Sequence, residues 1–220
     1  LERDGVRARE HDYLPDCVVC GSAGGIERLE AFKKGWFYVQ DAAARMSVMA
    51  LGIMPGMRIL DVCAAPGGKS FAAAAASHGE AEIVACDLHE NKLRRIEKSA
   101  GRLGFDGIIS TCACDGRIFR PEWEMAFDAV ICDVPCSGLG VIRKKPDIRS
   151  KPVSDFAALP EIQLAILRNA ARYVKQGGAI VYSTCTVLSA ENSGVARSFI
   201  EKNSDFCPED FSLPGGIGSS

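Results

Sequence analysis

The stretch RILDVCAAPGGKS, residues Arg58–Ser70, decides the fold. Its apolar first half predicts a β-strand over residues 58–63, and the Ala-rich run that follows predicts a helix through Ser77. Between the two, Gly67 and Gly68 let the backbone approach a ligand closely, and the start of the helix offers unpaired N–H groups. A strand, a tight loop and a helix in this order form the first unit of an α/β sheet.

The same alternation continues along the chain. Further strands are predicted over residues 82–86, 108–114, 128–132 and 179–183, and helices over residues 40–51, 91–103, 155–174 and 190–202. Gly177-Gly178 is expected to end the helix before the last strand. Strands and helices that alternate through short connections predict an α/β fold with a mostly parallel, doubly wound sheet. Residues 1–35 predict a few short strands or an irregular lead-in, and the Gly- and Ser-rich residues 213–220 predict a truncated or frayed end.

Length and composition narrow the class of protein. The 220 residues suffice for one large domain with a small N-terminal appendage. A net charge of −2 argues against a uniformly basic surface for nucleic acid. No apolar run is long enough to predict a membrane-spanning helix, and the charged N-terminus is not a signal peptide. The ten cysteines are therefore expected to be reduced thiols in a cytoplasmic protein.

Polar side chains close the predicted strands. Asp87, Asp115 and Asp133 each follow an apolar strand, and Cys185 follows the last one. Ligands of such sheets bind at the carboxyl ends of the strands. Asp87 is placed to accept hydrogen bonds from ribose hydroxyls, and Asp115 could face an adenine amino group. We therefore expect a nucleotide-like ligand at this edge of the sheet.

Two familiar nucleotide-binding motifs are absent. A phosphate-binding P-loop requires a glycine five residues before Gly68, and that position is Cys63. The dinucleotide pattern GxGxxG does not occur either. This glycine pattern argues against a nicotinamide-dependent enzyme.

Two cysteines lie on neighbouring loops at the same edge. The strand over 128–132 runs into DVPCSG, residues Asp133–Gly138, and the last strand runs into STCT, residues Ser183–Thr186. A single cysteine is most often a buried structural thiol. A cysteine in a turn at the binding edge is exposed enough to react. Cys136 and Cys185 are therefore candidates for nucleophilic chemistry.

The remaining cysteine motifs do not predict a metal site. Cys17-x-x-Cys20 lacks a second CxxC or a suitably spaced pair of histidines. Cys112-x-Cys114 lies within a predicted strand, and we expect its two thiols to face opposite sides. No metal is expected.

A basic run follows the Cys136 loop. Arg143, Lys144 and Lys145 have two interpretations, a solvated loop or contacts with phosphate groups.

Together, these motifs resemble the Sun/Fmu-like (RsmB-type) RNA cytosine-5 methyltransferases, in particular the ribosomal RNA branch. The matching segments are residues 39–41, 60–70, 86–87, 114–117, 133–149, 159–167, 177–178, 182–186 and 191–192. They occur in the order of the family, and the paired PCSG and STCT loops are its most specific feature.

The resemblance implies a Rossmann-like class I fold that binds S-adenosylmethionine. The implied cofactor residues are Cys63, Ala64, Ala65, Pro66, Gly67, Gly68 and Lys69 around the methionine part, Asp87 at the ribose, Asp115 at the adenine and Asp133 at the junction with the target base. Cys185 would be the nucleophile and Cys136 would assist release of the product. Arg143, Lys144 and Lys145 would contact RNA.

Cytosine chemistry gives an independent reason for these residue types. Carbon 5 of cytosine is a poor nucleophile, and addition of a thiolate to carbon 6 makes it reactive. Loss of the carbon 5 proton then requires a base, a role that the second cysteine can fill directly or through water. Asp133 could hydrogen-bond the cytosine edge. Because the base must be unstacked, single-stranded or loop RNA is the expected substrate.

The expected organisation is an N-terminal lead-in over residues 1–35, the end of an RNA-binding region, and a catalytic domain over residues 36–220. The C-terminal hairpin of the family is expected to be missing from this chain, and a monomer is expected. The expected function is methyl transfer to cytosine carbon 5 in ribosomal RNA of the 16S type.

Three other functions share parts of this pattern. These are a transfer RNA cytosine-5 methyltransferase, a DNA cytosine-5 methyltransferase with Cys136 as nucleophile, and a non-catalytic ribosome-assembly factor. The second cysteine loop argues against the DNA enzyme, and the intact cysteines and aspartates argue against the non-catalytic factor.

Overall fold

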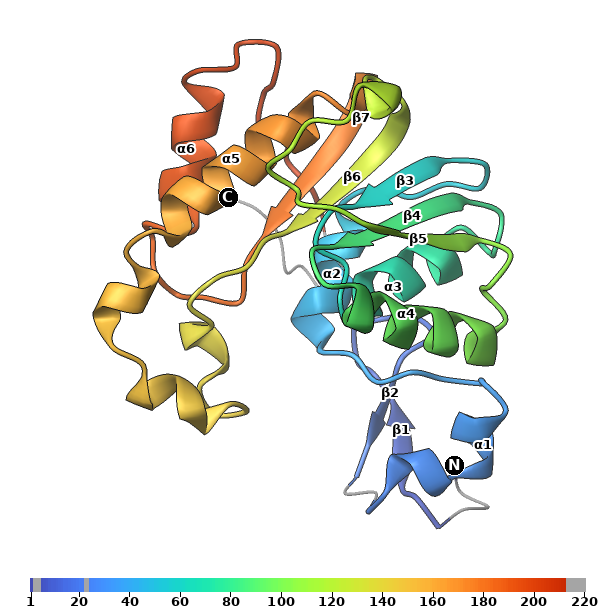
Figure 1. Ribbon diagram of the computed structural model, residues 1–220. Coiled ribbons are helices and arrows are strands. Elements are labelled where there is room, and N and C mark those ends of the chain that lie inside the picture. The colour runs from blue at the N-terminus through green and yellow to red at the C-terminus, as the bar shows by residue number, and fades with distance from the viewer. Residues whose placement is uncertain (2–4, 22–23, 213–220) are drawn as a thin grey trace.

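A parallel sheet forms the centre of the protein, whose computed structural model describes residues 1, 5–21 and 24–212 (Figure 1). Its strands in the described part are β3 (Arg58–Asp61), β4 (Glu82–Asp87), β5 (Ile109–Ala113), β6 (Phe127–Asp133) and β7 (Val174–Ser183). Their order is β5-β4-β3-β6-β7, and every neighbouring pair is parallel. The predicted parallel α/β sheet is confirmed.

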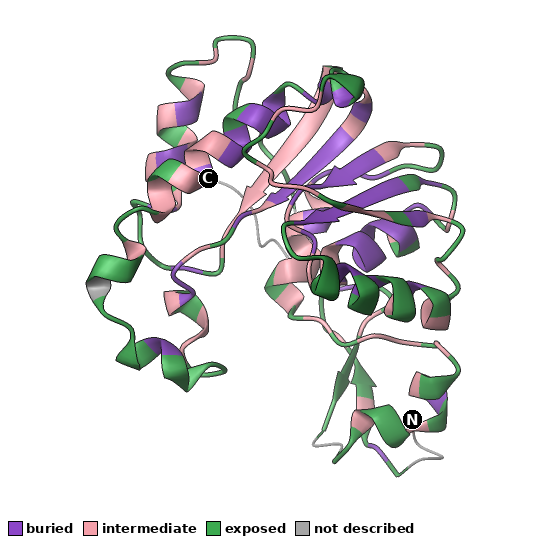
Figure 2. Ribbon diagram, in the orientation of Figure 1, coloured by how far each residue is buried: buried purple, intermediate pink, exposed green. Residues whose placement is uncertain are grey.

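Helices cover both faces of the sheet. On one side pack α2 (Ala42–Met49), α3 (Gly68–Ala76) and α4 (Glu90–Leu103), and on the other α5 (Leu159–Ala171) and α6 (Ser193–Ile200). Successive strand residues alternate between the two cores, since Ile59 packs with α3 and α4 and Leu60 packs with α5. The central strands are buried on both faces (Figure 2). The sheet is therefore doubly wound.

The strand order shows where a ligand-binding crevice forms at the edge of the sheet. The chain runs outward from β3 to β4 and β5, then returns to the other side of β3 to form β6 and β7. The loops after β3 and β6 therefore lead in opposite directions. In sheets of this kind a ligand-binding crevice forms between two such loops, at the carboxyl ends of the strands. These are the loops that begin at Val62 and at Val134.

The start of β7 differs from the prediction. The helix ends at Ala171, and the strand starts at Val174 rather than at residue 179. Val174 pairs with Phe127, and the pairing resumes with a shifted register at Ala179 and Ala129. The glycine pair lies inside this bulge instead of ending the helix. A Cβ on Gly178 would come 2.6 Å from the Asp128 carbonyl oxygen, so the bulge requires a glycine there.

The predicted helix over 155–174 is also shorter than expected. A 3-10 turn occupies Val153–Phe156, and α5 begins at Leu159 with a proline in its first turn. Proline at the start of a helix is favourable because its missing N–H would have no partner there.

A small N-terminal unit lies apart from the main sheet (Figure 1). It contains the antiparallel pair β1 (Ala8–Glu10) and β2 (Val18–Cys20), followed by the short helix α1 (Glu30–Lys33). Arg102 of α4 donates hydrogen bonds to the carbonyl oxygens of Phe32, at 2.7 Å, and Phe37, at 3.0 Å. The short strands predicted here are confirmed, and these bonds attach the segment after β2 to the main domain.

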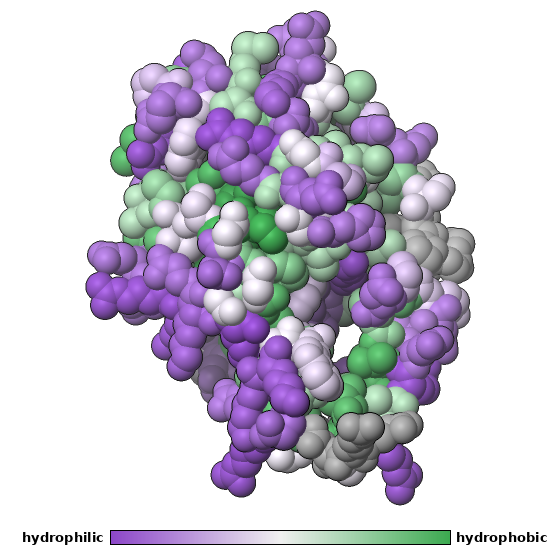
Figure 3. Space-filling view, turned by 90° about the vertical axis from the view of Figure 1, so that its right-hand side faces the viewer, coloured by the Kyte–Doolittle hydropathy of each residue, from purple (hydrophilic) through white to green (hydrophobic). Residues whose placement is uncertain are grey.

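The predicted frayed end over residues 213–220 lies outside the described residues. Among the helices that the structure describes, none combines the length and the apolar character needed to cross a bilayer. On the face of the molecule shown in Figure 3, polar side chains dominate the outline and apolar side chains gather in the upper centre.

Candidate active site

The loop after β3 forms a compact turn against the neighbouring strand. The Ala64 N–H donates to the Cys86 carbonyl oxygen at 2.7 Å, and the Gly67 N–H donates to the Ala64 carbonyl oxygen at 2.6 Å. Gly67 has a positive φ of 104°, and a Cβ there would come 2.6 Å from the Phe71 ring. Only glycine fits this position, because both the backbone conformation and the space exclude a side chain.

The two predicted nucleotide-binding aspartates come from neighbouring strand ends. Asp87 ends β4 and is buried, and the Cys114 N–H donates to its carbonyl oxygen at 3.1 Å. The Asp87 carboxylate accepts from the His89 N–H at 3.0 Å. Asp115 pairs with Arg117 at 2.6 Å, and this hydrogen bond lowers the pKa of the Asp115 carboxyl. Both side chains are thus brought to the carboxyl edge beside the β3 loop.

A third carboxyl, which is buried, was not predicted as part of the site. Asp61, the last residue of β3, is 1% exposed and accepts from the Ser70 hydroxyl at 2.7 Å. Burial raises the pKa of Asp61 to about 7. Its position at the end of an otherwise apolar strand is the sequence signal, the same one that pointed to Asp87.

Asp133 contacts both the segment that follows the β3 loop and the end of β7. Its Oδ2 lies 2.6 Å from the Lys69 Nζ, on the helix that follows the β3 loop. Its Oδ1 accepts from the Ser183 hydroxyl at 2.7 Å, at the end of β7. One carboxylate therefore links the predicted cofactor loop to the strand that leads to Cys185.

The two predicted catalytic thiols are in contact. The Sγ atoms of Cys136 and Cys185, called the cysteine pair below, lie 3.2 Å apart, and both are free thiols. The Cys185 N–H also points to the Cys136 Sγ at 3.2 Å. Cys185 is exposed, whereas Cys136 is half-buried.

The contact makes the two thiols chemically different. The hydrogen bond from Cys136 lowers the pKa of Cys185 to about 6, and the charge of Lys145 acts in the same direction. The same bond and burial raise the pKa of Cys136. The two shifts favour the proton on Cys136 and the thiolate on Cys185.

A buried carboxylate supports the cysteine pair, and the sequence reasoning gave it no role. Glu191 is 1% exposed, and its Oε2 accepts from the Ser137 N–H at 2.9 Å and from the Gln163 Nε2 at 2.8 Å. Gln163 also donates to the Pro135 carbonyl oxygen at 3.0 Å. Glu191 and Gln163 therefore fix the residues on both sides of Cys136.

The same network reaches the Cys185 loop. The Ser137 and Thr186 hydroxyls lie 2.7 Å apart, and both are buried. The Tyr182 hydroxyl donates to the Glu191 carbonyl oxygen at 2.6 Å. Each cysteine is thus flanked by a residue that is hydrogen-bonded to the other loop or to Glu191. Polar residues at buried positions, Gln163 on the inner face of α5 above all, are the sequence signal that could have revealed this network.

Glycines allow the two loops to touch. A Cβ on Gly138 would come 2.9 Å from the Ile148 side chain and 4.0 Å from the Cys185 Sγ. A Cβ on Gly140 would come 2.9 Å from the Cys185 carbonyl oxygen, which accepts from the Gly140 N–H at 3.0 Å. The Cys136 loop therefore packs on the Cys185 backbone.

The basic run lies on an exposed excursion between β6 and α5. Arg143, Lys144 and Lys145 are all exposed, between the 3-10 turns Leu139–Val141 and Pro146–Ser150. Lys144 forms an ion pair with Asp41. Lys145 acts on Cys185 by its charge. The structure thus places this run beside the cysteine pair.

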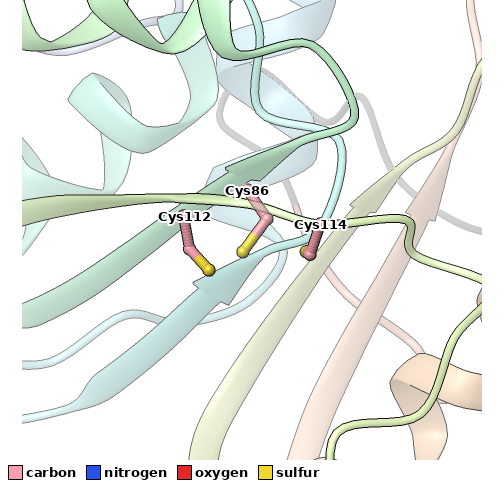
Figure 4. A group of neighbouring side chains, drawn as sticks. All are labelled: Cys86, Cys112 and Cys114. Atoms are coloured by element: carbon pink, nitrogen blue, oxygen red, sulfur yellow. The ribbon is translucent and has the colours of Figure 1, made fainter.

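The prediction for Cys112 and Cys114 is wrong. Residues two apart on a strand share a face, so their thiols point to the same side. With Cys86 of β4 they form a group whose Sγ atoms all lie within 4.8 Å of one another (Figure 4). Cys86, Cys112 and Cys114 are called the thiol cluster below.

A large groove lies elsewhere on the described part of the chain. It measures about 1270 Å³ and runs along β7, α6 and residues 205–211. Neither cysteine of the pair lines it.

The sheet order and the binding edge define a Rossmann-like α/β fold, the fold of S-adenosylmethionine-dependent methyltransferases. A methyltransferase homologue from Pyrococcus horikoshii has this fold, with a TM-score of 0.78 and 26% identity over 96% of this chain and 66% of that chain. NSun6 from Pyrococcus horikoshii, solved with the S-adenosylmethionine analogue SFG, has a TM-score of 0.75 and 31% identity over 82% of this chain and 46% of that chain.

Sequence comparison gives the family. Residues 48–218 match the family model described as 16S rRNA methyltransferase RsmB/F, and the chain belongs to this family. The probable ribosomal RNA small subunit methyltransferase B of Bacillus subtilis is 39% identical over 95% of this chain and 47% of its own length. Ribosomal RNA small subunit methyltransferase B of Salmonella arizonae is 37% identical over 99% of this chain and 51% of its own length. The chain therefore spans about half the length of these relatives.

Proposed function

We propose that this chain transfers a methyl group from S-adenosylmethionine to carbon 5 of a cytosine in ribosomal RNA of the 16S type. Cys185 is the nucleophile in this proposal. The observation that carries it is the contact of the two thiols, whose Sγ atoms lie 3.2 Å apart, and the lowered pKa of Cys185 favours its thiolate form. Membership of the 16S rRNA methyltransferase family supports the choice of RNA.

The residues at the sheet edge fit the cofactor. The β3 loop has no side chain at Gly67, where a Cβ would collide with Phe71, so its backbone can lie close to a ligand. Asp87 is at the end of β4, where a carboxylate can accept hydrogen bonds from ribose hydroxyls, and Asp115 lies beside it for the adenine. Residues Cys63–Lys69 would hold the methionine part. Bound S-adenosylmethionine supplies an electrophilic methyl group.

Cys185 activates the target base. Its thiolate would form a bond to ring carbon 6, and the electrons of the carbon 5–carbon 6 double bond would make carbon 5 nucleophilic. Carbon 5 would then take the methyl group while the sulfur–methyl bond of the cofactor breaks and leaves its electrons on the sulfur. Asp133 lies between the Lys69 Nζ and the Ser183 hydroxyl, at the place where the cofactor loop meets the cysteine loops. A carboxylate held there can hydrogen-bond the cytosine edge and favour the addition.

Release of the product requires a base. The carbon 5 proton leaves to the base, its bonding electrons restore the ring double bond, and the bond from carbon 6 to sulfur breaks. This returns Cys185 as a thiolate. Cys136 is the neighbouring group for this step, directly or through water. Once Cys185 is bound to carbon 6, its charge no longer retains the Cys136 proton, so Cys136 can reach its basic form.

The exposed basic run and the N-terminal unit are the proposed RNA contacts. Arg143 and Lys145 are exposed, and Lys145 is near enough to Cys185 to act on it by its charge, so the run can meet the phosphates next to the target base. Residues 1–35 would be the end of an RNA-binding region, and residues 36–220 the catalytic domain. The cytoplasmic location and the monomeric state stay predictions.

The test is methylation of purified 16S rRNA by this chain with isotope-labelled S-adenosylmethionine, followed by digestion and mass spectrometry of the nucleosides. We expect the label in 5-methylcytidine. Label in another nucleoside would refute the cytosine-5 assignment. Label in transfer RNA but not in ribosomal RNA would refute the substrate. Calorimetry that shows no binding of S-adenosylmethionine to the folded chain would favour a non-catalytic assembly factor.

A further inference from the structure

The thiol cluster lies on a rigid part of the sheet. Cys86 and Cys112 are partners in the register of β4 and β5, and Cys114 follows two residues after Cys112 on the same face. The Cys86 carbonyl oxygen accepts from the Ala64 N–H, and the Cys114 N–H donates to the Asp87 carbonyl oxygen. Because both strands are fixed by these bonds, the three thiols are held together by the backbone rather than by a flexible loop.

The spacing of the sulfur atoms suits a shared ion. A thiolate binds zinc at about 2.3 Å, and three sulfur atoms arranged in a plane around an ion at that distance would lie about 4 Å apart. All three Sγ atoms already lie within 4.8 Å of one another. Rotation about the side-chain bonds is therefore enough to close the site, with no change of the strands.

The donor set selects the kind of ion. Three sulfur donors are soft ligands, which favour copper(I) and zinc over magnesium or calcium. Within the described residues, the group contains these three thiols and no fourth His, Cys, Asp or Glu ligand. Structural zinc takes four ligands. An ion that accepts three sulfur atoms in a plane, of the copper(I) class, therefore fits better than zinc.

The surroundings can balance the charge. Three thiolates around a monovalent ion carry a net charge of −2. The Arg120 Nη1 lies 3.3 Å from the Cys112 Sγ, and its guanidinium is held over the Trp123 ring at 4.6 Å and by Glu122 at 2.9 Å. Cys86 is completely buried. The cluster thus combines an anchored positive charge with a side that excludes water, which favours retention of the ion.

We propose that Cys86, Cys112 and Cys114 bind a single thiophilic ion of the copper(I) class through their three sulfur atoms. The site is separate from the cysteine pair, and its occupation does not depend on the proposed methyl transfer. The three cysteines supply the ligands, and Arg120 supplies the positive charge beside them.

The experiment is an anaerobic titration of the reduced chain with copper(I) in competition with a chromogenic copper(I) chelator. The variant Cys136→Ser/Cys185→Ser is the background, because the cysteine pair could also bind copper. We expect one copper(I) per chain in this background. Adding Cys114→Ser or Cys112→Ser should weaken binding by about 100-fold or more. Cys132→Ser, another buried thiol packed on the same face, is the matched control and should retain binding.

X-ray absorption of the copper-loaded background variant gives the second measurement. Three sulfur neighbours at about 2.3 Å are expected. The proposal is wrong if copper is bound only when the cysteine pair is intact, or if Cys112→Ser and Cys114→Ser leave the affinity unchanged. It is also wrong if the copper has two sulfur neighbours. Since Cys112 and Cys114 are only half-buried, these variants test the site even if Cys86→Ser does not fold.

Discussion

The cysteine pair and the thiol cluster use the same side chain in two different settings. The pair lies on loops that follow β6 and β7, where Cys185 is exposed and a buried network of polar groups holds both loops. Two thiols of the cluster lie within β4 and β5, Cys114 follows directly after β5, and Cys86 belongs to the apolar core. The cysteine pair can reach a substrate because Cys185 is exposed on a loop, whereas the thiols of the cluster, packed side by side on the sheet, suit a small ion. The position in the sheet, more than the residue type, separates the two roles.

The largest difference is expected in methylation activity. Cys185→Ser should lower the rate by at least about 10³-fold, because the nucleophile is lost. Cys112→Ser, in the cluster, should keep most of the activity. The measurement is the rate of 5-methylcytidine formation, with Cys207→Ser as a control for loss of an exposed thiol. A comparable loss in Cys112→Ser and Cys185→Ser would remove the distinction between the two groups.

A second difference concerns pH. The lowered pKa means that Cys185 is mostly thiolate above about pH 6, so its alkylation should reach a plateau at neutral pH and fall below pH 6. In Cys136→Ala the hydrogen bond is gone, and the midpoint should rise toward the ordinary thiol value of about 8.5. Site-resolved mass spectrometry after iodoacetamide pulses measures both curves. An unchanged midpoint in Cys136→Ala would show that Cys136 does not activate Cys185.

A smaller effect is expected from the buried support. Glu191→Gln keeps the shape of the side chain but replaces the carboxyl group whose Oε2 accepts hydrogen bonds from Ser137 and Gln163. We expect kcat to fall by about 10–100-fold, since a charged hydrogen bond is worth about 1.5–3 kcal/mol. The affinity for S-adenosylmethionine should stay the same.

The control for this prediction is Glu201→Gln, an exposed glutamate just after α6. A positioning role also predicts that Glu191→Gln moves the pH midpoint of Cys185 alkylation, because the distance between the two thiols changes. Lower stability with an unchanged midpoint and unchanged kcat would reduce Glu191 to a purely structural residue.

The smallest expected effect is on stability. Cys86→Ser places a hydroxyl in the dry core, whereas Cys112→Ser changes a half-buried position. The free energy of unfolding should fall by about 1 kcal/mol more for Cys86→Ser than for Cys112→Ser. Urea denaturation of both variants in the metal-free state measures the difference. Equal losses would contradict the different burial of the two thiols.

The parts of the molecule that follow from local pattern could be predicted from the sequence. The strand that leads to Asp133 and the loop that carries Cys136 are continuous in the chain, so their order and position at the sheet edge follow from periodicity. The start of β7 could not be placed, because its bulge depends on pairing with Phe127 on another strand. From the local sequence alone, Gly177 and Gly178 predict the end of a helix.

The hydrogen-bond network around Glu191 could not be predicted from the sequence for a related reason. Glu191 acquires its role only when α5 brings Gln163 to it and the Cys136 loop brings Ser137. The spacing of these three residues in the sequence does not predict that they contact one another. The thiol cluster depends both on local strand geometry and on the pairing of two strands. The shared face of Cys112 and Cys114 follows from strand geometry and was misjudged, whereas the arrival of Cys86 depends on the register of β4 with β5.

Trapping of the covalent adduct tests the central claim, that Cys185 attacks the target base, most directly. The measurement is intact-mass spectrometry of the Cys136→Ala variant after incubation with 16S rRNA and S-adenosylmethionine, followed by nuclease digestion and peptide mapping. The account predicts that this variant accumulates a stable protein–RNA adduct at Cys185, because the step that releases the product is impaired. The same adduct formed instead at Cys136 in the Cys185→Ala variant would contradict the account and reverse the roles of the two cysteines.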